Sequence, residues 1–219
     1  MSSPRVLDLR GTTLEPSDLE PVAAHVRREG IIAYPTETVY GFGGLCSPEA
    51  VALVRSLKRR AEDRPLLVLV RSGEDASGLH WTEGARELAS VFWPGSVTLV
   101  LRDPDGIFPD GVRSREGTVA VRVSPHPFVS RLLDLLGTPL TSTSANAPGE
   151  VPALTGREAL DAALSLGAGN EMLVVDGGSL ARSGPSTIVD CSGATPVVVR
   201  EGTVPVSRLR CAVPEIHGR

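Results

Sequence analysis

Lysine is almost absent from this sequence. Of its 22 basic residues, only Lys58 is a lysine, and all the others are arginines. Lysine carries a compact point charge, whereas arginine presents a planar fork of five donors, so the two are not interchangeable. A single lysine kept beside Arg59 and Arg60 therefore suggests a contact with phosphate or carboxylate. Chance placement explains it as well, and so does the favourable position of cations at a helix C-terminus.

Cysteine, aromatic residues and long apolar runs are scarce too. The three cysteines form no Cys-x-x-Cys pair, which argues against a zinc site, and their low, odd number favours a reducing cytoplasm over a disulfide scaffold. Aromatic residues make up 4% of the chain and offer few rings on which nucleic-acid bases could stack. No apolar run reaches the roughly 18 residues of a membrane span. We therefore expect a cytoplasmic protein without a membrane segment.

The charge balance excludes proteins that bind nucleic acid mainly through overall positive charge. The net charge is −4 and the isoelectric point is about 5.6, so any RNA contact would need a local basic patch. A length of 219 residues with 41% hydrophobic residues suits one soluble domain with a large core. We assign residues 1–213 to this domain and residues 214–219 to a loose C-terminal tail.

Hydrophobic periodicity predicts helices and strands that alternate over the first two thirds of the chain. Helices are expected from a capping box at Ser17 to Gly30, from Pro48 to the basic cluster, and over 82–91 and 127–136. Strands are expected at 31–34, 66–70, 97–101, 118–123, 139–142, 172–175, 187–189 and 197–199, with a polar loop at 103–116. This order predicts a single-domain α/β fold with a twisted, mixed parallel and antiparallel sheet flanked by helices.

The most specific stretch is residues 35–41, which read Pro-Thr-Glu-Thr-Val-Tyr-Gly directly after a buried strand. Polar loops at strand ends are where open α/β sheets bind ligands. A capped turn also uses threonine and glycine. A glutamate flanked by hydroxyls at an apolar strand end nevertheless favours a site.

Other strand ends carry polar groups as well. Residues 142–146 place short hydroxyls and an asparagine after a strand, where they can donate to an anion or form a helix cap. Thr118 and Arg122 share one face of a strand, and an arginine that faces inward needs an anionic partner. Residues 185–187 and 200–202 repeat the pattern.

No common catalytic fingerprint accompanies these groups. The sequence has no Rossmann spacing, no P-loop Gly-Lys-Ser/Thr, no Gly-x-Ser-x-Gly elbow, and only four scattered histidines. Arginines, one lysine and many hydroxyls at strand ends are suited to binding a polyphosphate and a small carboxylate. Such sites act by positioning and charge neutralisation rather than by covalent catalysis.

Taken together, these segments resemble the YrdC family of L-threonylcarbamoyladenylate synthases, in its short form. They occur in family order between about residues 30 and 202, and the combination is specific although each segment alone is not. The segments are 35–41, Lys58 with Arg60, 93–95 with Thr98, 118–122, 144–146, 186–187 and 200–202.

The resemblance implies helices and a sheet around a concave, positively lined cavity, and it implies a reaction. L-threonine and bicarbonate give N-carboxythreonine, which attacks the α-phosphate of ATP to form threonylcarbamoyl-AMP and pyrophosphate. A tRNA threonylcarbamoyl transferase complex then moves the group to the adenosine beside the anticodon. Mg²⁺ is expected with ATP, without dedicated protein ligands.

The resemblance also implies roles for single residues. The residues expected to contact threonine are Thr38, Arg122, Ser142 and Ser186. The residues expected to contact ATP are Arg60, Arg64, Thr118, Ser144, Asn146 and Arg200. Lys58 and Arg60 are expected to be catalytic, by neutralising phosphate or carboxylate charge, and Thr36 and Tyr40 to support the site.

The chain departs from the family pattern at several positions. Arg64 stands where relatives often carry asparagine, Leu69 where they often carry a histidine that contacts threonine, and Ser124 where proline is common. Two other functions remain open at this point. One is an RNA-binding maturation factor that uses the same basic cavity, and the other is carbamoyl-phosphate handling during maturation of a metalloenzyme.

Overall fold

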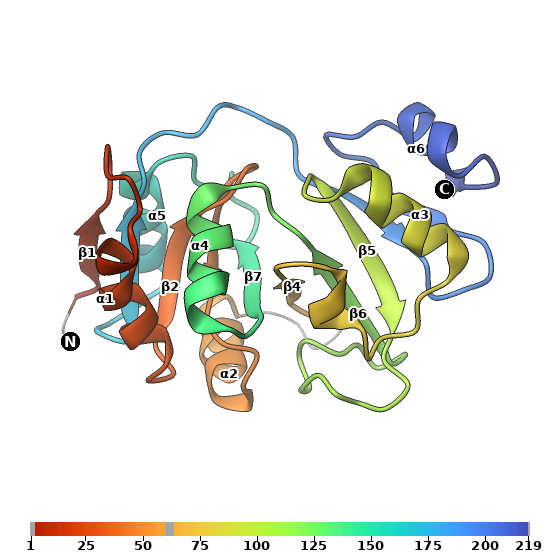
Figure 1. The fold of residues 1–219 in the computed structure, drawn as a ribbon. Helices are drawn as coiled ribbons and strands as arrows, with labels where there is room; N and C mark the ends of the chain where they lie inside the picture. Colours follow the sequence, from red (N-terminus) through yellow and green to blue (C-terminus); the bar gives the residue numbers. More distant parts are fainter. Residues whose placement is uncertain (1–2, 60–63, 219) are drawn as a thin grey trace.

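A computed structural model describes residues 3–59 and 64–218 of the chain, so the predicted site residue Arg60 lies outside the described residues. Within this part of the chain, all strands join one sheet in the order β1-β8-β2-β3-β7-β4-β6-β5-β9-β10-β11 (Figure 1). Parallel pairs such as β2 with β8 stand beside antiparallel pairs such as β2 with β3. The α/β prediction, with a mixed sheet and flanking helices, is confirmed.

The strands are β1 Arg5–Asp8, β2 Ile31–Pro35, β3 Tyr40–Gly43, β4 Leu67–Leu69, β5 Val97–Arg102, β6 Thr118–Arg122, β7 Leu140–Ser144, β8 Met172–Asp176, β9 Thr187–Asp190, β10 Val197–Arg200 and β11 His217–Gly218. The helices are α1 Pro16–Val26, α2 Pro48–Leu57, α3 Glu83–Phe92, α4 Pro127–Leu136, α5 Gly156–Ser165 and α6 Val206–Ala212, with a short 3₁₀ helix at Gly73–Ala76. Among the residues described, no helix is long and apolar enough to cross a membrane.

The alternation of side chains along β2 builds two hydrophobic clusters. Ile32 and Tyr34 belong to a cluster with α1 and α4, whereas Ile31 and Ala33 belong to a larger cluster with α2 and α5. Successive residues of a strand point to opposite faces of the sheet, so this fully buried strand needs helices on both sides. Figure 1 shows α1 and α4 in front of the sheet and α5 behind it.

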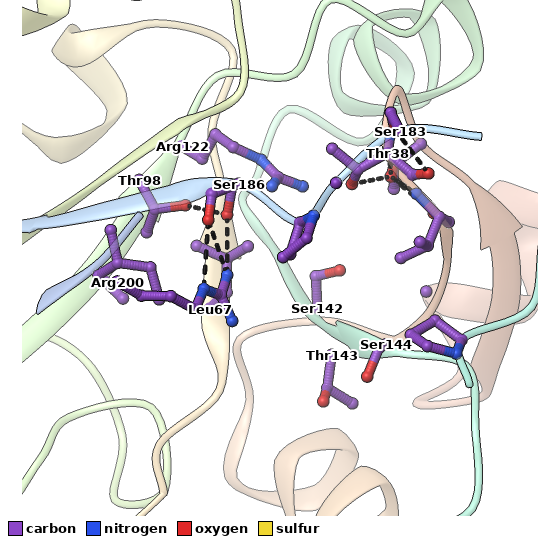
Figure 2. Close-up of a pocket in the computed structure, with 18 of the residues that line it drawn as sticks. Thr38, Leu67, Thr98, Arg122, Ser142, Thr143, Ser144, Ser183, Ser186 and Arg200 are labelled. Carbon is purple, nitrogen blue, oxygen red and sulfur yellow. Dashed lines mark hydrogen bonds between the residues drawn. The ribbon is translucent and has the colours of Figure 1, made fainter. Parts of the chain in front are cut away.

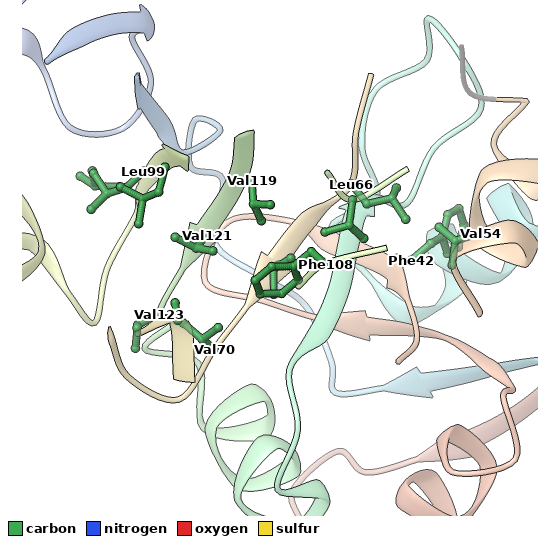
Figure 3. Close-up of a cluster of buried hydrophobic side chains, with 14 of the residues drawn as sticks. Phe42, Val54, Leu66, Val70, Leu99, Phe108, Val119, Val121 and Val123 are labelled. Carbon is green, nitrogen blue, oxygen red and sulfur yellow. The ribbon is translucent and has the colours of Figure 1, made fainter. Parts of the chain in front are cut away.

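The larger cluster continues beneath the second half of the sheet (Figure 3). There the loop at 103–116, predicted to be simply polar, buries Phe108 and Val112. The fully buried carboxylate of Asp103 accepts hydrogen bonds from the backbone N–H groups of Ile107 (3.0 Å) and Phe108 (3.1 Å). The loop is therefore a packed part of the core, because its polar side chains satisfy the buried backbone.

Several local predictions are corrected. Helix α1 begins at Pro16, and its capping interactions involve Glu15 and Asp18 instead of Ser17, because proline suits the first helical position. Strand β3 is not among the strands that the sequence predicts, since glycine is depleted in strands. The close approach of β7 requires those glycines: a Cβ at Gly43 would lie 1.9 Å from the carbonyl oxygen of Thr141.

The predicted loose tail is partly ordered. Ile216 is 1% exposed and belongs to the larger cluster. His217–Gly218 pairs in parallel with β10. The prediction does not hold for these residues, because Ile216 buries its side chain against the domain.

The fold predicts a graded reactivity of the three cysteines. Burial raises the pKa of Cys46 and of Cys191 to about 12, whereas Cys211 is exposed. Because the thiolate is the reactive form, a disulfide reagent at pH 8 should label Cys211 first in the native protein. Mass spectrometry of the labelled peptides measures this order, and the unfolded protein, in which all three should react equally, is the control. Labelling of Cys191 as fast as Cys211 in the native state would contradict the structure.

Candidate functional site

A cavity of about 740 Å³ opens between side chains from both halves of the sheet. One wall comes from the β2–β3 connection and β7, the other from β4, β5, β6, β9 and β10. The segment 177–186 between β8 and β9, which we call the strap, adds further residues; Figure 1 shows it passing above the sheet. The polar residues that line the cavity are Thr36, Thr38, Thr98, Arg122, Ser142, Thr143, Ser144, Arg182, Ser183, Ser186 and Arg200.

A hydroxyl-centred turn presents Thr38 to the cavity. The Oγ1 of Thr36 accepts hydrogen bonds from the backbone N–H groups of Thr38 (3.2 Å) and Val39 (3.3 Å) and donates to the carbonyl of Val39 (2.6 Å). Such bonds replace the ladder partners that the backbone leaves behind at the end of a strand. Thr36 thus fixes the turn.

Ser186 is held from two sides on the opposite wall (Figure 2). Its hydroxyl lies 3.0 Å from that of Thr98, and its carbonyl accepts from Nη2 (2.9 Å) and Nε (3.3 Å) of Arg200. Burial, and then the neighbouring charge of Arg122, lower the pKa of Arg200. An anion placed between these arginines would stabilise their charged forms.

Arg122 faces inward and has an anionic partner, as the sequence predicts. Its side chain is 5% exposed, and its Nε lies 3.4 Å from Oε1 of Glu37. The other carboxylate oxygen of Glu37 accepts a hydrogen bond of 2.5 Å from the hydroxyl of Ser124. The pairing offsets much of the free energy that a buried, unpaired guanidinium would cost.

The strap is attached to the start of β3 and to the turn that precedes it. The hydroxyl of Tyr40 donates to the carbonyl of Gly178 (2.7 Å) and accepts from the N–H of Gly177 (3.0 Å). Farther along, the hydroxyl of Ser183 donates to the carbonyl of Thr38 (3.2 Å). Tyr40 therefore acts by holding the strap and does not itself line the cavity.

Lys58 is buried against the turn that follows β7 and does not line the cavity. Its ammonium group donates to the carbonyl of Ser144 (2.9 Å), to Oδ1 of Asn146 (2.9 Å) and to the carbonyl of Asn146. It also lies 5.9 Å from the centre of the Phe42 ring. These contacts place the ammonium group on the turn after β7, and the catalytic role expected of Lys58 stays a prediction.

The structure brings together some of the predicted residues and not others. Those that line the cavity are Thr36, Thr38, Arg122, Ser142, Ser144, Ser186 and Arg200. Those placed outside the lining are Lys58, Arg64, Thr118, Asn146 and Tyr40. Thr118 is paired with the hydroxyl of Ser114 (2.8 Å) at the far end of β6, and Leu69 is buried against α1 and α4. The amide nitrogen of Asn146 donates to the carbonyls of Ala147 and Glu150.

Four polar lining residues were missed as site residues, namely Thr98, Thr143, Arg182 and Ser183. Thr98 was named with residues 93–95 in the resemblance, but no other feature of the sequence marks it as a site residue. Arg182 and Ser183 lie on the strap, which has no periodic pattern. Within the described part of the chain, no group of three histidine, cysteine or acidic residues could hold a metal ion.

Fold and site together define an α/β protein with a cavity lined by hydroxyls and arginines. The family model Sua5/YciO/YrdC, described as "Telomere recombination", matches residues 24–202. The chain belongs to this family.

Named relatives agree with this assignment. A threonylcarbamoyl-AMP synthase of Xanthomonas campestris is 41% identical over 156 residues, covering 67% of this chain and 80% of that protein. The enzyme of the same name from Bacillus subtilis is 34% identical over 89% of this chain, which spans 56% of that protein's length. The crystal structure of Pyrococcus abyssi Sua5 complexed with L-threonine superposes with a TM-score of 0.89 at 29% identity. It covers 98% of this chain, which spans 62% of its length.

The contacts of Lys58 predict a loss of stability in Lys58→Ala. The Ser144 carbonyl would keep the N–H of Asn146 (3.1 Å) and the Asn146 amide oxygen would keep the Ser144 hydroxyl (2.6 Å), but both would lose their charged donor, as would the Asn146 carbonyl. Hydrogen bonds to a charged group contribute about 1.5–3 kcal/mol. Urea unfolding should show a decrease of that size in the free energy of unfolding. Arg28→Ala, in the exposed turn after α1, is the control and should change it by less than about 0.5 kcal/mol. Full stability of Lys58→Ala would show that the three contacts do not support the turn.

Proposed function

We propose that this chain is a threonylcarbamoyl-AMP synthase, an enzyme that converts L-threonine, bicarbonate and ATP into threonylcarbamoyl-AMP and pyrophosphate. The observation that carries the proposal is the meeting of Thr38 and Ser142 from one wall with Arg122 and Ser186 from the other, around one cavity. Its volume of about 740 Å³ lies in the range of small-molecule sites. The names of the relatives and the threonine complex of the Pyrococcus protein support the same reaction.

The charges of the cavity support anionic reactants. Arg122, Arg182 and Arg200 contribute positive charge, and the described lining residues include no aspartate or glutamate. ATP and a carboxylated amino acid both carry negative charge. Charge-assisted hydrogen bonds contribute about 1.5–3 kcal/mol each, so a few such contacts would account for binding in the micromolar range.

The proposed chemistry needs positioning and no covalent enzyme intermediate. A carboxylate oxygen of N-carboxythreonine attacks the α-phosphorus of ATP, the bond from that phosphorus to the oxygen bridging to the β-phosphorus breaks, and pyrophosphate leaves. Thr38, Ser142 and Ser186 would hold threonine, with Arg122 on its carboxylate. Arg200 and Ser144 would neutralise or bind phosphate oxygens. Holding both reactants in line is the main source of acceleration in such reactions.

Mg²⁺ would enter with ATP, since the described lining offers hydroxyls but no carboxylate. When bound to the phosphates, it would neutralise the charge that develops on pyrophosphate. Transfer of the product to a tRNA threonylcarbamoyl transferase complex is part of the proposal, as is a cytoplasmic location.

The first test is the release of pyrophosphate from ATP. We expect it to require both L-threonine and bicarbonate, measured with a coupled pyrophosphate assay. The Bacillus subtilis enzyme under the same conditions is the positive control. No threonine-dependent release by this protein, while the control is active, would overturn the proposal. RNA affinity that falls with salt and does not depend on threonine would instead favour an RNA-binding maturation factor.

Single substitutions should separate the two substrates. Ser142→Ala removes one hydroxyl from the threonine side, and we expect the KM for threonine to rise about tenfold, which corresponds to 1.4 kcal/mol. Arg200→Ala removes a charged donor from the phosphate side and should raise the KM for ATP by about tenfold or more. Steady-state kinetics with each substrate varied in turn measures both effects. An Arg200→Ala enzyme with an altered KM for threonine alone would reverse the assignment.

A further inference from the structure

We infer that Glu37 is a positioning residue for the amino-acid substrate. Together with Ser124, it fixes the guanidinium group of Arg122 so that the terminal nitrogens of Arg122 receive the substrate carboxylate. The inference rests on the proposed function and adds residues to which no role has been given above.

The side chain of Arg122 faces Glu37 with only one edge of its guanidinium group. Its Nε and the Oε1 of Glu37 are both buried, and neither makes a hydrogen bond, although they lie 3.4 Å apart. Among the described residues, the terminal nitrogens of Arg122 have no hydrogen-bond acceptor either. Arg122 lines the cavity, and Figure 2 shows its guanidinium group directed toward the side that carries Thr38. One edge of the guanidinium thus meets Glu37, and its terminal nitrogens are left for a ligand.

Glu37 is held both at its backbone and at its carboxylate. Its backbone lies inside the turn that the Thr36 hydroxyl closes. Its carboxylate accepts the 2.5 Å hydrogen bond from Ser124. The Ser124 hydroxyl in turn accepts from the backbone N–H of His126 (3.2 Å), the residue that caps α4. This second bond leaves the hydroxyl proton for Glu37, so the start of α4 fixes the carboxylate.

Glu37 acts on the ligand through Arg122 and not by direct contact. Glu37 does not line the cavity, and its Oε1 is out of contact with solvent, so a ligand in the cavity would not touch it. An arginine side chain has much rotamer freedom to lose when it binds a carboxylate. A fixed carboxylate beside Nε removes part of that freedom before the ligand arrives. Because Thr38 follows Glu37 in the same turn, fixing Glu37 also fixes the position of Thr38 relative to Arg122. These are two of the side chains proposed to contact the amino-acid substrate.

Ser124 is the residue that holds the carboxylate of Glu37 from the side of α4. The serine therefore adds a restraint on Glu37, and its loss should have a smaller effect than loss of the carboxylate charge.

The test is calorimetric binding of L-threonine and, separately, of α,β-methylene-ATP. Glu37→Gln keeps the shape of the side chain and removes its charge. We expect the Kd for threonine to rise about tenfold, the Kd for the nucleotide to change less than about twofold, and Ser124→Ala to raise the threonine Kd by about threefold. Glu29→Gln is the matched control, because Glu29 also accepts a hydrogen bond from a serine, Ser47, and lies outside the cavity lining. It should leave both Kd values unchanged.

A double-mutant cycle separates positioning from general structural support. In an Arg122→Ala background, Glu37→Gln should have little further effect on the threonine Kd, because the group through which Glu37 acts is gone. Thermal unfolding of each variant confirms that it is folded. Equal loss of threonine and nucleotide binding in Glu37→Gln, unchanged threonine binding, or the same loss in the Arg122→Ala background would overturn the inference. If the unaltered protein binds no threonine, the proposed function fails first.

Discussion

The close approach of β3 to β7 is the constraint on which the cavity depends. A Cβ at Gly43 would meet the carbonyl oxygen of Thr141 at 1.9 Å, and a Cβ at Gly41 would meet the hydroxyl of Ser142 at 2.9 Å. Only residues without a side chain allow the two strands to pair in this way. The pairing joins the turn that carries Thr38 to the strand that carries Ser142, so one wall of the site exists only because those positions are glycine.

Charge is distributed unevenly over the two walls. Arg122 is paired with Glu37, whereas Arg200 donates to a neutral carbonyl, and burial lowers its pKa. A lowered pKa means that the charged form of Arg200 is less stable here than in water. An anion bound near Arg200 would stabilise the charged form of Arg200. An anion bound near Arg122 would gain less, because Arg122 is already paired with Glu37. The arrangement therefore favours the higher negative charge, such as phosphate, on the Arg200 side.

The parts of the fold that the sequence predicts are those that follow from local patterns. The buried strand at 31–34, the helix capped by Ser47 and the inward face of Arg122 follow from periodicity, capping and the free energy of burying a charge. Strand β3 and the strap depend on contacts between distant segments. The tie between Tyr40 and Gly178, for example, joins residues 138 positions apart, which no local pattern reports. Many of the residues that the resemblance assigns to the site line the cavity, because the family segments meet there.

The single lysine makes structural contacts that its local pattern does not report. A lysine among arginines suggests a ligand, yet three oxygens of Ser144 and Asn146 converge on its ammonium group beneath the cavity wall. An ammonium group directs three donors tetrahedrally from one atom, so it can serve three acceptors around a point. The donors of a guanidinium group are spread over a plane and cannot converge in that way. The geometry of the turn after β7 is thus a sufficient reason for a lysine at this position, where it contacts Ser144, a residue that lines the cavity.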